Sequence, residues 1–151
     1  MEKSRQYTTR RLGIVNALVD ALKDIDGTGY YLSNLDQNVS PRLKFWDEVE
    51  EFPALHLNAG SETREYQAGG YKDRFLSLTI RCYVKEEDSV AALDALLEDV
   101  ETVIEENSRI RYKDRNNVDQ YTQQITVVSI DTDEGVLEPL GVGEIVLEVR
   151  Y

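Results

Sequence analysis

Residues 75–84 read FLSLTIRCYV, and their side chains alternate between an apolar set and a mixed set. The apolar set consists of Leu76, Leu78, Ile80, Cys82 and Val84. Successive side chains of a β-strand point to opposite faces of its sheet. The segment therefore predicts a long strand with one face on the core and the other turned outward.

Further strands are predicted on both sides of this segment. Residues 52–58 (FPALHLN) start with a proline next to an apolar run, which is typical of the first position of a strand. Residues 121–130 are rich in Ile, Val and Thr, and residues 144–151 alternate between apolar and polar side chains. We also expect short strands at 30–32 and 42–46.

Two other segments carry apolar residues at steps of three and four, which places them on one stripe of a helix. The first stripe consists of Ile14, Val15, Leu18, Val19, Leu22 and Ile25. The second consists of Val90, Leu93, Leu96, Leu97, Val100, Val103 and Ile104. Thr8 or Thr9, or Ser4 in a slightly longer helix, can cap the first start, and Asp88 or Ser89 can cap the second.

The order of elements is helix, two or three strands, helix, two strands. This order predicts a single α+β domain over residues 1–151, with a mostly antiparallel β-sheet and two main helices packed on it. Long loops are expected near 60–73, 107–120 and 131–143. The first of these loops is polar and contains two adjacent glycines, so we expect a mobile arm there.

The net charge excludes several classes of protein. The chain has 29 acidic residues against 17 Lys and Arg, which leaves a formal charge of -12. Binding to nucleic acid or to an anionic membrane depends on Lys and Arg, so neither is expected as the main function. No stretch is long and apolar enough to predict a secretory signal or a membrane span.

Residues for catalysis or metal binding are scarce. His56 is the only histidine and lies within an apolar strand pattern, so we expect it on the less buried face of a strand. Cys82 is the only cysteine and falls on the core face of its strand, which favours a buried apolar role. We therefore predict no enzyme activity, no cofactor and no metal site. One alternative stays open, a small cation-dependent enzyme or ligand-binding domain that uses Asp131, Asp133 and Glu134.

The remaining signals point to interaction surfaces. Tyr7, Tyr66, Tyr71 and Tyr112 fall in predicted loops or at a terminus, and tyrosine is favoured at protein interfaces. Charge is also uneven, because acidic residues gather on the outer face of the second helix and over 131–148. The candidate residues for contact with another subunit or another protein are Arg109, Arg111, Lys113, Arg115, Tyr66 and Tyr71. Oppositely charged surfaces on one small chain suit head-to-tail assembly of a ring.

The whole chain also resembles a known family. The matching features are an amphipathic helix at 11–24, the run FPALHLNAGSE at 52–62, the strand LSLTIRCYV at 76–84, a helix that opens near Ser89, and the terminal IVLEVRY at 145–151. This layout resembles the tail terminators of long-tailed bacteriophages, the family of minor tail protein U.

The resemblance implies a structural virion protein that forms a hexameric ring on the tail tube, terminates tube polymerisation and presents a surface to the head-tail connector. The implied partners are other copies of the chain, the tail tube protein and the connector protein, while DNA would only pass through the lumen. The implied location is the virion tail, after assembly in the host cytoplasm. Neck proteins between portal and tail share some of these features, so another head-tail joining role also stays open.

Overall fold

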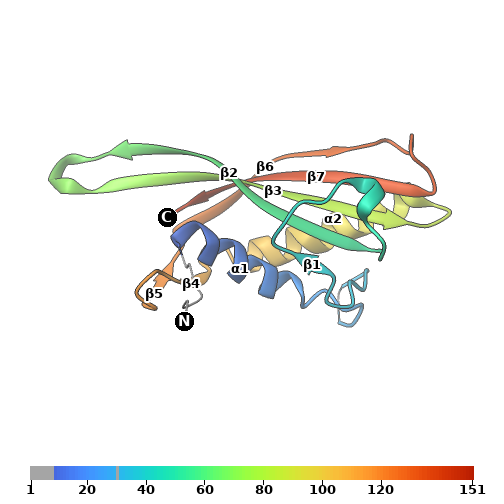
Figure 1. The fold of residues 1–151 in the computed structure, drawn as a ribbon, viewed down its shortest axis with the longest axis horizontal. Coiled ribbons are helices and arrows are strands. Elements are labelled where there is room, and N and C mark those ends of the chain that lie inside the picture. Colours follow the sequence, from blue (N-terminus) through green and yellow to red (C-terminus); the bar gives the residue numbers. More distant parts are fainter. Residues whose placement is uncertain (1–8, 30) are drawn as a thin grey trace, which may run out of the picture.

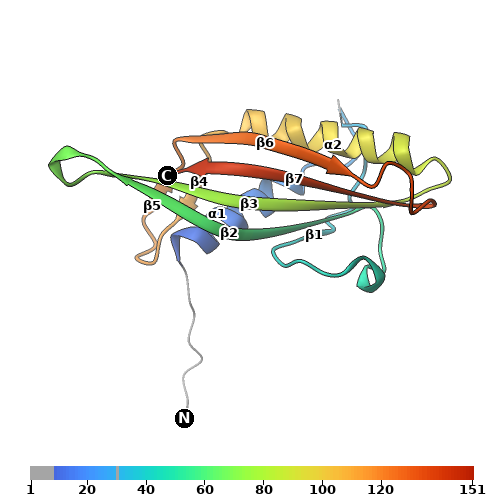
Figure 2. The ribbon, with the colours of Figure 1, turned by 90° about the horizontal axis from the view of Figure 1, so that it is seen from above.

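A five-stranded sheet with two α-helices on one face forms the body of the molecule (Figures 1 and 2). The computed structural model describes residues 9–29 and 31–151. The strands are β1 (Val39–Ser40), β2 (Ala54–Tyr66), β3 (Lys72–Lys85), β6 (Gln124–Thr132) and β7 (Leu140–Arg150). Their order is β1-β2-β3-β7-β6, and every neighbouring pair is antiparallel except β1 and β2. The predicted α+β class is confirmed.

Strand β3 lies in the middle of the sheet and carries the predicted alternation. On one side Ile80 is opposite Leu57 of β2, and on the other Leu78 is opposite Leu147 of β7. All four side chains are fully buried, as is Cys82. Burial raises the pKa of the Cys82 thiol, so this residue acts as a small apolar side chain, as expected.

The two helices, α1 (Arg10–Leu22) and α2 (Ser89–Glu106), pack on the core face of the sheet. Thr9 caps α1 and Asp88 caps α2, because each side-chain oxygen accepts a backbone N–H three residues along, at 3.1 Å and 3.2 Å. Both caps agree with the sequence prediction. Ile25 is also buried as predicted, although α1 ends three residues before it. No helix in the described residues is both long and apolar enough to cross a membrane.

A separate two-stranded sheet packs against α1 at the N-terminal end of that helix. Its strands are β4 (Arg111–Lys113) and β5 (Asp119–Tyr121). The backbones come close at Gly13, where an added Cβ would overlap the carbonyl oxygen of Lys113. The absence of a side chain at Gly13 therefore sets how closely this small sheet approaches the helix.

The predictions of short strands at 30–32 and 42–46 are wrong. Tyr31 and Leu32 lie in an irregular segment, and Tyr30 is outside the described residues. Residues 42–45 are irregular as well, and a short 3-10 helix, η1 (Trp46–Glu48), follows them. The alternation at 42–46 therefore belongs to a loop that rests on the sheet.

This loop covers the part of the outer sheet face that contains His56. The Lys44 backbone N–H donates to Nδ1 of His56 at 3.3 Å, and the Tyr83 hydroxyl donates to the Lys44 carbonyl at 3.0 Å. His56 does lie on the face opposite the helices, as predicted, but the loop leaves it only 3% exposed. Burial, with the charges of Lys44 and Arg81, lowers the pKa of His56.

The predicted long loops are shorter than expected. Residues 61–73 are mostly strand, because β2 continues to Tyr66 and β3 starts at Lys72. Residues 107–120 contain β4 and the start of β5, and the loop at 131–143 shrinks to the turn 133–139. The sequence signal was weak here because strands with solvent on both faces show no apolar alternation.

Candidate interaction surfaces

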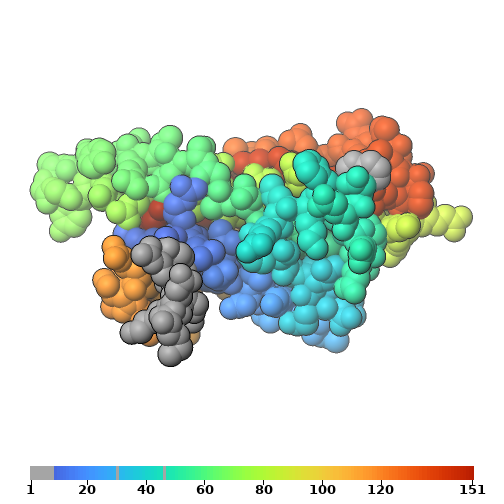
Figure 3. Space-filling view, in the orientation of Figure 1, coloured from blue at the N-terminus to red at the C-terminus, as the bar shows by residue number. Residues whose placement is uncertain are grey.

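Strands β2 and β3 continue past the body of the sheet as a two-stranded arm, residues 61–73 (Figures 1 and 3). Strand β7 ends at Arg150, opposite Phe75, and the next residue, Tyr151, still exchanges two backbone hydrogen bonds with Arg74. Beyond Arg74, β3 pairs with β2 alone. The pairing runs out to Tyr66 opposite Lys72. The arm is therefore a hairpin of paired strands that protrudes from one end of the molecule, where the sequence predicted a long loop.

The arm closes in a tight turn that needs glycine. Gly69 and Gly70 both have φ of +83°, a conformation that side chains other than glycine's rarely adopt. The Gln67 N–H donates to the Tyr71 carbonyl at 2.7 Å and closes the turn. The turn thus holds the flanking tyrosines in a defined place.

The arm carries two of the most exposed aromatic side chains among the described residues. Tyr66 is 74% exposed and Tyr71 is 76% exposed, and the Lys72 ammonium lies 5.9 Å from the centre of the Tyr66 ring. Large aromatic rings that are so open to water on a protruding hairpin are typical of contact with another protein. The position of both residues is compatible with the predicted interface role.

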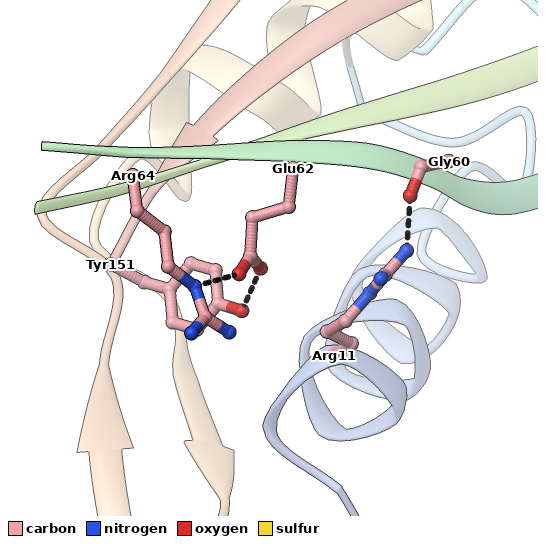
Figure 4. A network of polar contacts seen from close by, with 5 residues as sticks. All are labelled: Arg11, Gly60, Glu62, Arg64 and Tyr151. Carbon is pink, nitrogen blue, oxygen red and sulfur yellow. Dashed lines mark hydrogen bonds and ion pairs between the residues drawn. The ribbon is translucent and has the colours of Figure 1, made fainter.

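The base of the arm is tied to α1 (Figure 4). The pairing of β2 with β3 is irregular between Ala59 and Glu62, which is the sign of a β-bulge. The Arg11 guanidinium donates to the Gly60 carbonyl within this irregular stretch. One helix side chain therefore fixes the point where the strand leaves the body.

The C-terminal residue also fastens the arm (Figure 4). The Tyr151 hydroxyl donates to the Glu62 carboxylate, and Arg64 pairs with the same carboxylate at 2.8 Å. The guanidinium carbons of Arg10 and Arg74 lie 5.4 Å and 5.5 Å from the centre of the Tyr151 ring. This cluster joins the N-terminal helix, the arm and the chain end.

The cluster shifts the pKa of both acidic groups in it. Burial acts to raise the pKa of Glu62, but the hydrogen bonds from Tyr151 and Arg64 outweigh it, and the net pKa lies below its ordinary value. Burial, with the neighbouring Glu62 carboxylate, raises the pKa of Tyr151 to about 12. At neutral pH the phenol is therefore a donor and the carboxylate an acceptor, the combination that their contact requires.

The basic residues predicted as contacts lie on and beside the small sheet. Arg109, Arg111, Lys113 and Arg115 are all exposed, but only Arg111 and Lys113 belong to a strand. Lys113 forms an ion pair with Asp119 of the neighbouring strand. The four cations, called the basic segment below, therefore gather on the surface without lying on one continuous extended face.

The structure corrects one prediction in this segment. Tyr112 was expected to be a loop residue that the core did not need, yet it is only 3% exposed. Its ring packs edge-to-face on Tyr151 at 6.5 Å between centroids, and Arg10 donates to its hydroxyl at 3.3 Å. Tyr112 belongs to the core, and Tyr7, named with it, lies outside the described residues.

The outer face of α2 is acidic, as predicted, with one exception. Asp94 and Glu98 are exposed there, whereas Asp99 is only 2% exposed. The Asp99 carboxylate accepts backbone N–H groups from Leu32, at 3.0 Å and 3.1 Å to its two oxygens, and from Ser33 at 2.7 Å. This residue holds the segment after α1 against α2.

A groove of about 480 Å³ lies beside that segment. Apolar side chains line much of it: Leu32, Phe52, Pro53, Val84, Ala92 and Ala95. Leu32 is 65% exposed although its backbone is fixed by Asp99. The groove is lined by residues from the end of β3 and the start of α2. These two element ends lie at the opposite end of the molecule from the arm (Figures 1 and 2).

Sequence reasoning identified neither this groove nor the cluster of Arg11, Glu62 and Tyr151. Leu32 was the available signal for the groove, but it ends the run YYL at 30–32, which led to a predicted strand. The cluster joins residues 11, 62 and 151, and no local pattern in a single sequence connects such distant positions.

The alternative cation site lacks support in the described residues, where no three His, Cys, Asp or Glu side chains are grouped to hold a metal ion. The Asp133 carboxylate instead accepts N–H groups of its own turn, from Gly135 at 3.5 Å and from Leu137 at 3.3 Å. The Asp133 carboxylate therefore stabilises the turn to which it belongs.

Comparisons with known proteins agree on one family. A sequence profile described as "Bacteriophage Tail Tube Terminator Protein" matches residues 8–151. The "Tail tube terminator protein p142" of Escherichia phage T5 is 35% identical over 149 residues, which cover 93% of this chain and 92% of that protein.

A solved structure is similar in fold. A chain in the "Virion of native gene transfer agent (GTA) particle" aligns with a TM-score of 0.55 and 10% identity, over 91% of this chain and 96% of that one. Because the identity is so low, this likeness bears on the fold alone.

Proposed function

Because the chain belongs to the bacteriophage tail tube terminator family, we propose that it caps the tail tube as a hexameric ring of identical subunits and presents the opposite side of that ring to the head-tail connector. It is a structural protein of the virion tail, as the sequence resemblance predicted. The observation that carries the proposal is the family match over residues 8–151.

A ring requires each subunit to offer two different surfaces, because head-to-tail contacts join unlike patches. The chain has such surfaces, since the arm with Tyr66 and Tyr71 protrudes at one end and an apolar groove lies at the other. The exposed basic segment and the acidic face of α2 add charge of opposite sign. These features support self-assembly and contact with the tube protein.

The ring would surround a channel for DNA. A net charge of -12 suits a channel through which DNA moves without being held, because phosphates are repelled by an acidic wall. The structural role needs no catalysis, and we propose that the chain has none.

The test is tube polymerisation with and without the purified chain. The cognate tail tube protein is allowed to polymerise, the chain is added in increasing amounts, and tube length and tube ends are measured by negative-stain electron microscopy. We expect shorter tubes with a ring at one end. A chain that neither binds tube ends nor changes tube length would overturn the proposal.

A further inference from the structure

We propose that the tip of the arm, residues 66–72, docks in the groove between β3 and α2 of a second copy of the chain. This inference rests on the proposed ring and names the contact that builds it. Figures 1 and 2 show the arm and the elements that form the groove at opposite ends of the long axis. The contact is therefore heterologous, and a ring satisfies every arm and every groove.

The arm is unable to reach the groove of its own subunit. Its base is fixed by Arg11 on Gly60 and by Tyr151 and Arg64 on Glu62. Arg150 adds an ion pair to Asp73 at 3.1 Å. A hairpin held on both strands points away from the body, so the occupant of the groove has to come from another molecule.

The groove suits an aromatic side chain. Its volume of about 480 Å³ falls within the range of about 300–1,000 Å³ that is common for sites that bury a small ligand. Leu32 and Phe52 form apolar walls, and Asp99 keeps the Leu32 wall in place through its bonds to the backbone. A wall that is already ordered loses little conformational freedom on binding.

The tip supplies matching chemistry. Tyr66 and Tyr71 are largely exposed, and burying such rings dominates the energy of many interfaces. The segment 66–72, YQAGGYK, has one cation and no acid. The groove lining includes the exposed Lys85 and Glu86, and the segment 85–88, KEED, to which they belong has a net charge of -2. The two partners are thus complementary in charge as well as in apolar surface.

The experiment is site-directed disulfide formation in the full chain assembled on purified tail tubes. The variant Tyr71→Cys/Ala91→Cys places one thiol on the tip and one on the lining of the groove. Cys82 is fully buried and does not compete. Mild oxidation should give a ladder of covalently linked subunits on a non-reducing gel. The matched control is Tyr71→Cys/Val128→Cys, with the second thiol at an exposed position of β6, and it should give no ladder.

A second experiment measures how much side chains of the tip and of the groove contribute to subunit association. Tyr71→Ala should weaken subunit association at least about tenfold, as expected of an interface aromatic, and Leu32→Glu should do the same from the groove side. Phe45→Ala, which removes an exposed aromatic side chain from the loop at 42–46, should leave association unchanged. Circular dichroism checks that each variant remains folded.

The outcomes separate this contact from the proposed function. A ring with the ladder supports both, whereas a ring without the ladder overturns the contact and leaves the capping function intact. If Leu32→Glu weakens binding to the tube but not between subunits, the groove takes the tube protein and the inference is wrong. A chain that forms no ring on tubes overturns the ring and this contact with it.

Discussion

At the scale of single residues, the buried Asp99 is expected to contribute strongly to the stability of the fold. Its carboxylate accepts backbone N–H groups from Leu32 and Ser33 while only 2% exposed. Asp99→Ala leaves these donors unsatisfied, and we expect the free energy of unfolding to fall by about 2–4 kcal/mol. Urea denaturation followed by circular dichroism measures this loss.

The matched control for Asp99 is Asp94→Ala, which removes an exposed carboxylate from the same helix. Its effect should stay within about 0.5 kcal/mol. Equal effects of the two substitutions would mean that the Asp99 contacts contribute nothing to stability.

Glu62 makes stability depend on pH. The pKa of its carboxyl is lower in the folded chain than in the unfolded chain, so its contribution is full above the unfolded value and is lost as the pH falls through the folded value. Glu62→Gln should therefore lower the free energy of unfolding at pH 7 by about 1–2 kcal/mol. The difference from the unsubstituted chain should shrink once the pH falls below the ordinary glutamate pKa of about 4.3 and disappear below the lower pKa of the folded chain.

Unfolding free energies measured at a series of pH values between 7 and 3 test this prediction. Glu65→Gln, an exposed position on the same strand, serves as the control and should show no such convergence. A Glu62→Gln deficit that stays constant down to pH 3 would show that loss of the carboxylate charge is not its cause.

At the scale of elements, Gly13 decides how α1 meets the small sheet. Alanine in place of glycine within a helix ordinarily stabilises by about 1 kcal/mol. Here the new Cβ would overlap the backbone carbonyl of Lys113, and such overpacking costs about 1–3 kcal/mol. We expect Gly13→Ala to be neutral or destabilising by up to about 2 kcal/mol, because the clash opposes the helix gain.

The comparison for Gly13 is Asn16→Ala, one turn further along α1 at an exposed position. That change should be neutral or slightly stabilising, since alanine is the better helix former. Thermal unfolding of both variants gives the ranking. A Gly13→Ala variant that is more stable than Asn16→Ala would mean that the sheet moves away without cost.

Some elements of the fold could be predicted from the sequence, whereas others depend on packing that the sequence does not display. The helices and β3 were predictable, because residues such as Leu18, Leu96 and Leu78 repeat at a spacing that one buried face imposes. The arm was not, because none of its residues between 63 and 73 is buried, so its paired strands show no apolar alternation in the sequence. The loop at 42–46 alternates in sequence, yet it packs on His56 instead of joining the sheet.

Some residues of the candidate interaction surfaces could also be predicted from the sequence, and others could not. Tyr66 and Tyr71 could be chosen from sequence, because an aromatic residue in a polar stretch has no core to fill. Tyr112 looked the same in sequence but is buried against Tyr151, a contact between distant segments. Asp99 was read as part of an acidic surface because its partner backbone follows α1, far away in the chain.

At the scale of the whole molecule, charge is expected to guide assembly. The basic segment is exposed on one side of α1, and exposed acids lie along α2. Arg109→Glu/Arg111→Glu should weaken subunit or tube association by about tenfold or more without unfolding the chain, because like charges then face each other across the contact. Lys113 is left unchanged because its ion pair with Asp119 joins β4 to β5.

The control for this charge reversal is Arg42→Glu/Lys44→Glu, which changes the net charge by the same amount at two exposed positions far from the basic segment in sequence. Ring formation on tail tubes is measured by electron microscopy at several salt concentrations. If specific charge pairs hold the ring, only the first variant fails, and salt weakens the unsubstituted ring because it screens exposed charges. If both variants fail equally, total charge governs assembly and the basic segment has no special role. If neither fails, the apolar contact between arm and groove is sufficient to build the ring.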